Sequence, residues 1–390
     1  MNEIKYTGNP IIPKPCADPT MVQFGDRYYV YPTFGGIPEV GFGVWSSKDL
    51  TAFRDEGMIL KFSELSFAKK DAWAPDIIER NGRYYFYFSA DSSIGVAVAD
   101  TPTGPFVDPL GKPLIAFEED MSTIDPCVFI DDDGRTYLYW GATFYGKMFM
   151  RELNDDMLSF KGEKQVVFDY TLEKDYHCEG SYVFKRGGLY YYLWSEYIWC
   201  DSPELTHDHS YRVNYAVAKS PFGPFTKTLS RVPILSTDMT LGYIGPGHNS
   251  ILNPPGTDDY YIVYHQHNGN ARFRMANIDR MTFSPNGAIN TVRMTKEGVP
   301  AIPIAAWLSH EVVGAAAVGR EKRFVLGTRL APDAIDTVTL YANGSAVWCG
   351  KASDAPVWTP SETGVYKVWA VVSDRDSKTY TTKALNLDVI

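Results

Sequence analysis

The stretch "RNGRYYFYFSA", residues 80 to 90, is typical of a β-strand entered by a turn. Successive side chains of a strand point to opposite sides of its sheet, so Tyr84 and Phe86 share one face. Tyr85 and Tyr87 share the other face. A sheet with one face in water would carry polar residues on that face. The stretch therefore predicts a sheet that is covered on both faces.

Four similar stretches occur elsewhere: "FGDRYYVYPT" at 24 to 33, "DDGRTYLYWG" at 132 to 141, "RGGLYYYLWS" at 186 to 195 and "TDDYYIVYHQ" at 257 to 266. One position common to all five copies holds the residues that we call the anchor tyrosines: Tyr29, Tyr85, Tyr137, Tyr191 and Tyr261. They are separated by 56, 52, 54 and 70 residues. A repeat of this length, built from short strands, is typical of a propeller blade, and blades stacked around an axis cover both faces of every sheet. The sequence thus predicts an all-β fold with a five-bladed β-propeller.

The composition is that of a globular protein, because 45% of the 390 residues are hydrophobic and 14% are aromatic. The net charge of −10 disfavours nucleic acid and anionic membranes as partners, since either would require basic clusters. A neutral substrate fits this chain better. The sequence indicates no oligomeric state.

No run of residues reaches the length of a transmembrane helix, and the first fifteen residues lack the basic start and apolar core of a signal peptide. As written, the chain is expected in the cytoplasm, or in an extracellular or periplasmic location if a leader has been removed.

The five cysteines form no CxxC pair and are expected to be reduced thiols; they are Cys16, Cys127, Cys178, Cys200 and Cys349.

The aromatic repeat stops near residue 300, and a different strand pattern follows. In "DTVTLYANGSAVWCG" the pair Asn343-Gly344 is a hairpin signal, and further alternating strands come after it. We therefore predict a propeller over residues 1–302, a connector over 303–318 and a small immunoglobulin-like β-sandwich over 319–390.

One ionisable residue precedes each anchor tyrosine at a similar distance. Asp18, Asp76, Asp125, Glu179 and His248 lie 11, 9, 12, 12 and 13 residues before their anchors. Equivalent positions of successive blades are related by rotation around the axis, so these side chains are expected to meet at one end of the channel. Any one of these residues could simply stabilise a turn. Their similar distance from the anchor tyrosines favours a functional site instead. Acids held close together oppose one another's ionisation, so clustering them is unfavourable unless function requires it.

Several carboxylates in one pocket suit glycoside hydrolysis. One acid protonates the leaving oxygen, a second carboxylate activates water or attacks the sugar, and a third can keep the proton affinity of the acid high. A calcium-dependent lectin is an alternative, and its nearest motif is "IDDDGR" at 130 to 135, in a hairpin turn where solvated aspartates are normal. A non-catalytic carbohydrate-binding propeller is the competing class of function.

Over about residues 8 to 300 the chain resembles glycoside hydrolase family 43. The segments that carry the resemblance are "CADPTMVQFGDRYYVYPT", "WAPDIIERNGRYYFYFSA", "STIDPCVFIDDDGRTYLYWG", "CEGSYVFKRGGLYYYLWS" and "GPGHNSI". The resemblance implies that Asp18 is the general base, Asp125 a residue that modulates pKa and orientation, and Glu179 the general acid. It also implies that Trp73 and Asp76 line the sugar subsite.

The resemblance extends to binding residues. It makes His248 a candidate for an axial calcium held through water, although this histidine could equally bridge blades by hydrogen bonds; no cofactor is implied for the chemistry. It implies a basic substrate contact in the last blade, where Arg272 is favoured over Arg274. The aromatic residues Trp73, Phe34 and Tyr197 flank the axial motifs, and one or more of them is expected to form the pocket wall; Trp73 is favoured, and packing in the core is the alternative.

The resemblance implies hydrolysis with inversion, for which the base and acid carboxyls are expected about 6.5 to 9.5 Å apart. The expected activity is release of α-L-arabinofuranose from plant cell-wall carbohydrates. A β-D-xylosidase and a galactan- or galactofuranoside-directed hydrolase are the alternatives within the same family.

Overall fold

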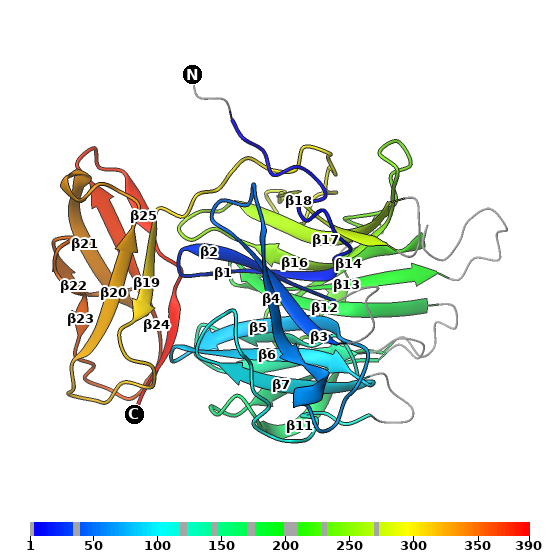
Figure 1. The fold of residues 1–390 in the computed structure, drawn as a ribbon, viewed down its shortest axis with the longest axis horizontal. Helices are drawn as coiled ribbons and strands as arrows, with labels where there is room; N and C mark the ends of the chain where they lie inside the picture. Colours follow the sequence, from blue (N-terminus) through cyan, green and yellow to red (C-terminus); the bar gives the residue numbers. More distant parts are fainter. Residues whose placement is uncertain are drawn as a thin grey trace.

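The computed structural model describes residues 4–33, 40–117, 123–141, 147–169, 176–198, 210–227, 232–268 and 273–390. The regular structure of this part is almost entirely β, and none of its helices is long and apolar enough to cross a membrane. Five sheets form the larger body and two more sheets form a smaller body beside it (Figure 1). The predicted all-β class with a five-bladed propeller is confirmed.

The five blades follow one another along the chain, and each starts with its inner strand. The first contains β1 (Ala17–Phe24), β2 (Arg27–Thr33), β3 (Gly41–Ser47) and β4 (Arg54–Lys61), and η1 (Phe62–Glu64) follows. The second contains β5 (Trp73–Arg80), β6 (Arg83–Ala90) and β7 (Ser93–Ala99). The third contains β8 (Cys127–Ile130), β9 (Thr136–Gly141), β10 (Lys147–Leu153) and β11 (Phe160–Asp169). The fourth contains β12 (Tyr176–Arg186), β13 (Leu189–Ile198), β14 (Arg212–Ala218) and β15 (Thr226–Lys227), and the fifth contains β16 (Tyr243–Leu252), β17 (Tyr260–Asn268) and β18 (Arg274–Met281).

The start of the chain closes the ring of blades. The N–H groups of Ile11 and Cys16 donate to the carbonyls of Ala276 and Arg274 in β18, at 2.9 and 2.8 Å. The first and fifth blades are therefore joined by backbone hydrogen bonds as well as by side-chain packing.

The aromatic stretch of β6 is covered on both sides by neighbouring blades. Phe86 packs with Tyr31 and Phe42 of the first blade, at ring-centroid distances of 5.8 and 5.3 Å. On the opposite face, Tyr85 and Tyr87 join a core cluster with residues of the third blade. Stacked sheets thus explain why neither face of this strand is polar.

The anchor tyrosines occupy one register position in all five blades. Each pairs with a residue of the inner strand, and these partners are Val22, Ile78, Phe129, Phe184 and Leu252. Residues of different inner strands can therefore be compared by counting back from these partners. The comparison does not depend on the length of the hairpin between the two strands.

Residues 306–390 form a body that we call the C-terminal module. Its two sheets contain β19 (Ala306–His310), β20 (Lys322–Thr328) and β23 (Val357–Trp358), and then β21 (Ile335–Ala342), β22 (Ser345–Gly350), β24 (Gly364–Asp374), β25 (Thr379–Thr381) and β26 (Leu385–Val389); η2 spans Pro332–Ala334. The two sheets share one apolar core. The predicted hairpin is present, because Ala342 pairs with Ser345 across Asn343-Gly344. The segment 303–318, expected to be only a connector, contains β19, which pairs with β20; the immunoglobulin type of this module stays a prediction.

The C-terminal module is bonded to the second blade. The buried Arg80 donates to Asp388 at 2.6 Å, and the N–H of Asn81 donates to the carbonyl of Asn386 at 2.8 Å. Glu79 accepts from the N–H of Asn386 and lies 3.2 Å from Nε2 of His310. These buried contacts hold the module against one end of the propeller.

The four cysteines in the described residues, Cys16, Cys127, Cys178 and Cys349, are free thiols, as predicted; Cys200 lies outside that part.

Candidate active site

The inner strands share a kink four residues before the partner of each anchor tyrosine. The five residues at this position all have positive φ: Asp18 (46°), Ala74 (38°), Asp125 (59°), Gly180 (68°) and His248 (45°). Pairing with the second strand shifts register at this point in the first, second, fourth and fifth blades. Positive φ is unfavourable for residues other than glycine, and such strain gathers at functional sites. Asp18, Asp125 and His248 thus occupy one structurally equivalent position.

Asp18 is buried among cationic and hydrogen-bonding groups. Its Oδ1 lies 2.8 Å from Nη1 of Arg274, 3.0 Å from Nδ1 of His265 and 3.3 Å from Nδ1 of His248. The hydroxyl of Thr33 donates to Oδ2. Burial alone would raise the pKa of Asp18, but Arg274, His248 and His265 outweigh it and hold that pKa well below its usual range. Asp18 is therefore a carboxylate at any pH near neutrality.

Asp125 has the opposite electrostatic environment. Burial raises the pKa of Asp125 to about 7, and the negative charges of Glu179 and Asp18 add to the rise against the pull of His248. Its Oδ2 accepts from the N–H of Gly180 at 3.0 Å, so it is bonded to the residue that follows Glu179. Asp125 is thus placed to influence both the charge and the position of Glu179.

Glu179 lies one residue before the kink of the fourth blade. Its Oε1 accepts from the hydroxyl of Tyr211 at 2.7 Å, and the Tyr211 ring stacks on His265 with an interplanar angle of 11°. Gly247 makes room for this ring, because a Cβ there would lie 2.1 Å from it. The hydrogen bond fixes the position of one oxygen of Glu179.

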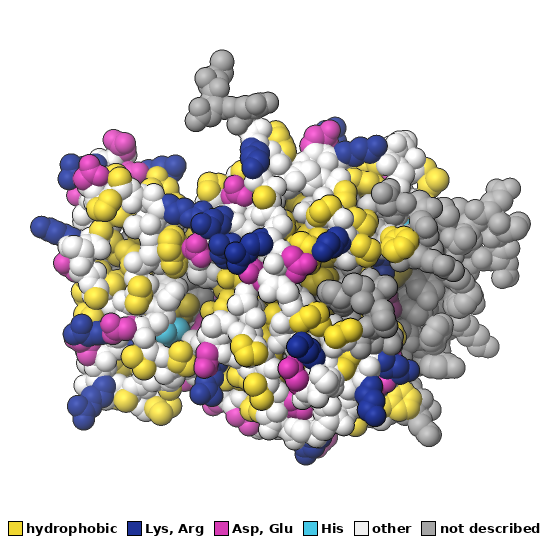
Figure 2. All heavy atoms as spheres, in the orientation of Figure 1, with side chains coloured by type: hydrophobic (Ala, Val, Ile, Leu, Met, Phe, Trp, Pro, Cys, Tyr) yellow, Lys and Arg dark blue, Asp and Glu magenta, His cyan; other side chains and the backbone are white. Residues whose placement is uncertain are grey.

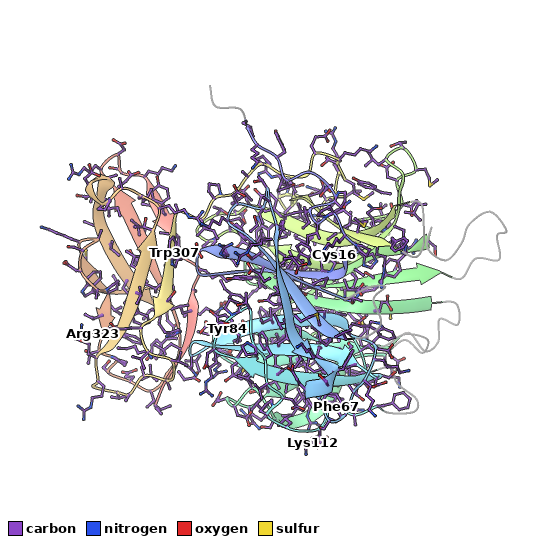
Figure 3. All side chains as sticks on the ribbon, in the orientation of Figure 1. Cys16, Phe67, Tyr84, Lys112, Trp307 and Arg323 are labelled. Carbon is purple, nitrogen blue, oxygen red and sulfur yellow. The ribbon has the colours of Figure 1, made fainter. Side chains whose placement is uncertain are left out.

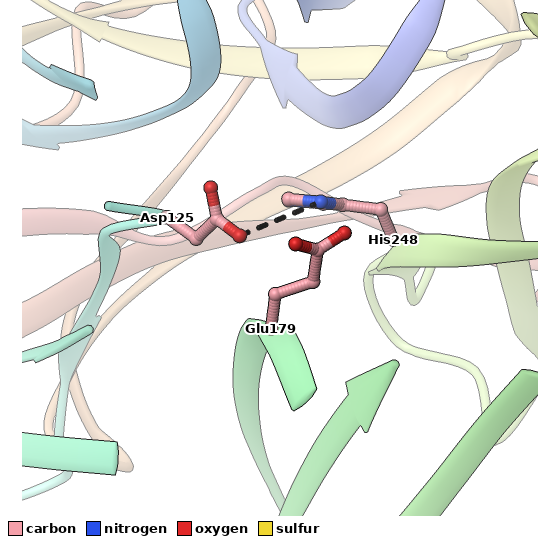
Figure 4. Close-up of side chains that lie close together, drawn as sticks. All are labelled: Asp125, Glu179 and His248. Carbon is pink, nitrogen blue, oxygen red and sulfur yellow. Dashed lines mark ion pairs between the residues drawn. The ribbon is translucent and has the colours of Figure 1, made fainter. Parts of the chain in front are cut away.

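Asp125, Glu179 and His248 lie around one point (Figure 4). One potential ligand atom from each residue falls within 4.8 Å of the other two, and Nδ1 of His248 is 3.8 Å from Oδ2 of Asp125. The N–H of His248 donates to the hydroxyl of Ser195 at 2.6 Å, which positions the kink. With Asp18, the structure brings together four of the five residues that were predicted to converge.

Asp76 is the residue that does not join them. It lies two residues after the kink of its strand, and its carboxylate accepts from the N–H groups of Ile77 and Val128, at 2.9 and 2.7 Å. The equivalent side chains of Cys127 and Ser250 also accept from a backbone N–H of the next blade. The described contacts of Asp76 therefore join blades, and its predicted place in the sugar subsite has no support among them.

The other predicted binding residues lie at the same end of the propeller or outside the described part. Trp73 occupies in β5 the register position that Glu179 occupies in β12, five residues before the anchor partner, and it is 40% exposed. Its ring is therefore free to face a ligand rather than being packed between blades. Phe34, Arg272 and the side chain of Tyr197 lie outside the described residues.

Three neighbours of the carboxylates come from the outer parts of the blades: His265 lies in β17, Arg274 lies in β18, and Tyr211 directly precedes β14. Arg274, left as the less favoured of two arginines, donates a hydrogen bond to Asp18. His265 and Tyr211 were not predicted, because they precede no anchor and have no motif of their own. Pairing of Gly247 with His265 places that histidine beside the kink, a relation that requires the strand register.

Comparison with known proteins agrees with this site. The family model "Glycosyl hydrolases family 43" matches residues 7–291. A β-D-galactofuranosidase of Aspergillus niger is 36% identical over 312 residues, covering 75% of this chain and 86% of that protein. An arabinoxylan arabinofuranohydrolase of Paenibacillus polymyxa is 30% identical and covers 76% of this chain and 53% of that protein.

Solved structures give the same result. The crystal structure of a thermostable family-43 glycoside hydrolase superposes with a TM-score of 0.65 at 30% identity, covering 76% of this chain and 98% of that one. The family-model match over residues 7–291 includes all four clustered residues. The chain belongs to glycosyl hydrolase family 43 and is a glycoside hydrolase.

Proposed function

We propose that this enzyme releases terminal α-L-arabinofuranose from plant cell-wall carbohydrates with inversion at the anomeric carbon. The observation that carries the mechanism is the contrast between two buried carboxyls: the pKa of Asp18 is held well below its usual range, and that of Asp125 is raised to about 7. Environments that push two carboxyl pKa values apart are the mark of separate roles in one reaction.

In the proposed reaction, Glu179 donates its proton to the glycosidic oxygen as the bond between that oxygen and the anomeric carbon breaks. Asp18 accepts a proton from a water molecule, whose oxygen bonds to the anomeric carbon from the opposite side. The products are the free sugar and the alcohol of the remaining chain, and the two carboxyls have exchanged protonation states. Proton exchange with solvent then restores them.

Asp125 and Tyr211 position the acid. Asp125 accepts from the N–H of Gly180, and the two acids resist ionising together, so the pair retains a proton that Glu179 can donate. The Tyr211 hydroxyl orients Glu179 from the other side. Trp73, at the same register position in another blade, supplies an aromatic wall for a sugar face.

The axial calcium remains part of the proposal only as a structural ion. Ca²⁺ prefers six to eight oxygen ligands, whereas Asp125, Glu179 and His248 offer two carboxylates and an imidazole. This donor set fits calcium only if water supplies most of the ligands, so no step of the mechanism is assigned to it.

A β-D-galactofuranosidase is the second candidate, because the Aspergillus niger relative with that activity is 36% identical over 86% of its length. Both sugars are five-membered rings of matching ring stereochemistry, and the galactose form carries a longer exocyclic group. The same carboxylates would serve either substrate, so the choice depends on the room beside the exocyclic carbon.

The test compares kcat/KM on the 4-nitrophenyl derivatives of α-L-arabinofuranose, β-D-galactofuranose and β-D-xylopyranose. We expect the highest value for the arabinofuranoside, and a higher value for the galactofuranoside would select the second candidate. Asp18→Ala, as control, should abolish turnover of all three. Proton NMR of the first-formed sugar should show inversion; retention would overturn the role of Asp18 as base.

A further inference from the structure

A large cavity lies between the propeller and the C-terminal module, and we call it the junction cavity. Its volume is about 990 Å³, and the inner strands of all five blades contribute to its wall, together with β19, β24 and the segment that joins β25 to β26. Pockets for small molecules commonly have volumes of about 300 to 1,000 Å³, so this one could hold an oligosaccharide fragment.

The junction cavity is at the opposite end of the inner strands from the carboxylate cluster. Asp18 lies near the start of β1, and Gln23, which lines the cavity, lies five residues later in the same strand. At about 3.3 Å per residue this places roughly 15 Å between their backbones. A ligand in the cavity therefore occupies a site distinct from the catalytic one.

Two buried polar atoms in the cavity wall have no hydrogen-bond partner among the described residues. They are Oε1 of Gln23, a residue that is 3% exposed, and Nδ1 of His310, whose side chain is 4% exposed. Leaving such groups unpaired is unfavourable, and a ligand hydroxyl could satisfy either of them after a small rotation of its side chain toward the cavity.

One cation in the wall also lacks a partner. The other charged side chains around the cavity have hydrogen-bond or ion-pair partners: Glu79 with His310, Asp132 with Lys185 and Lys367, Arg186 with Asp258, and Asp100 with Arg83. Asp76 accepts two backbone N–H groups. Among the charged residues that line the cavity, all of them in the described part, Lys383 alone has no ion pair or side-chain hydrogen bond. The side chain of Lys383 is exposed, while desolvation by the surrounding protein and then the nearby charge of Lys367 lower its pKa, so an anion beside it would be stabilised.

Aromatic side chains supply the apolar part of the wall. Trp307, Trp369 and Tyr84 line the cavity and are each partly exposed. Figure 3 shows Trp307 and Tyr84 at the junction between the two bodies. On the face shown in Figure 2, Lys and Arg side chains gather where the module meets the propeller, which favours the approach of an anion.

We propose that the junction cavity is a second carbohydrate site, which binds a monosaccharide- or disaccharide-sized ligand bearing a carboxylate, such as a uronic acid. The carboxylate pairs with Lys383, hydroxyls bond Gln23 and His310, and the apolar face of the ring packs on the aromatic wall. Each of the three features of the wall has a counterpart in this class of ligand, whereas a neutral sugar would leave Lys383 unpaired.

The test is titration calorimetry of the full chain with sodium D-glucuronate. We expect one saturable site that does not inhibit hydrolysis of a nitrophenyl glycoside. Lys383→Met should weaken binding by about tenfold or more, because a hydrogen bond to a charged group is among the stronger ones in proteins. Lys383→Arg should keep the binding, and Lys351→Met, a change at an exposed lysine of the same module, should not affect it.

Several results would overturn the proposal. They are no saturable heat, equal affinity in Lys383→Met, equal binding of methyl glucoside or of acetate, and inhibition of hydrolysis that is competitive with substrate. Thermal unfolding by circular dichroism, unchanged in Lys383→Met, is expected as the control that the variant is folded. Because calorimetry detects binding without turnover, the result stands whether or not the proposed sugar specificity is right.

Discussion

Arg274 is expected to set the pH range over which the enzyme works. Its Nη1 lies 2.8 Å from Oδ1 of Asp18 and is the strongest of the groups that lower the pKa of this carboxyl. An opposite charge at such a distance lowers the pKa of an aspartate by about 1 to 3 units. In Arg274→Met the pKa of Asp18 should therefore rise by about that much, the more so because the carboxylate stays buried.

The direction of the expected shift in the pH profile follows from the role of Asp18 as the base. Asp18 must be ionised to accept a proton, so activity is lost as the pH falls through its pKa. In the unchanged enzyme this loss should lie below pH values at which the assay is practical, whereas in Arg274→Met it should move up by about 1 to 3 units. Below the new pKa, kcat/KM should fall about tenfold for each pH unit.

The assay is kcat/KM against pH on an activated nitrophenyl glycoside, whose leaving group needs little protonation, so that the acid limb reports on the base. Arg280→Met is the matched control, since Arg280 lies on the same strand but pairs with the exposed Asp259 at 2.7 Å. Its pH profile should be unchanged. If Arg274→Met lowers kcat/KM by the same factor at every pH, Arg274 acts on the substrate and the reasoning is wrong.

Three further outcomes are expected. Glu179→Ala should retain much activity on activated aryl glycosides but lose natural linkages, as measured with both substrate types; equal loss on both would contradict its role as acid. Tyr211→Phe should lower kcat on natural linkages by about tenfold, the effect of one lost hydrogen bond of about 1.4 kcal/mol, with KM little changed; an effect on KM alone would place Tyr211 in substrate binding. Asp76→Ala should lower the free energy of unfolding by about 1 to 3 kcal/mol in urea denaturation with normal KM, because the buried N–H of Val128 loses its acceptor; normal stability with raised KM would restore Asp76 as a sugar contact.

The sequence by itself determined the number of blades and the approximate place of the catalytic residues. The anchor tyrosines repeat because every blade must present apolar side chains to two neighbours, and such packing leaves a period that can be read along the chain. Asp18, Asp125 and His248 were found because the kink always lies four residues before the anchor partner.

The sequence did not show which inner-strand residue occupies the kink in each blade. The reason is that the number of residues between an anchor tyrosine and its paired residue differs from blade to blade. It is 7 for Tyr29 and Tyr85 but 9 for Tyr261, so distances counted from the anchor mix hairpin length with position in the strand. Asp76, at 9 residues, looked close enough to join the others, and only the pairing register shows that Ala74 occupies the equivalent position.

Only the tertiary structure decided the electrostatics of the site. Arg274 and His265 reach Asp18 across more than 240 residues of sequence, and Tyr211, which directly precedes β14, reaches Glu179 within the fourth blade. The pKa of a carboxyl depends on the charges and burial within a few ångströms, and these neighbours are brought in by ring closure and strand pairing rather than by any local pattern. The junction cavity arises in the same way, because its wall forms only where the C-terminal module meets the ends of five separate strands.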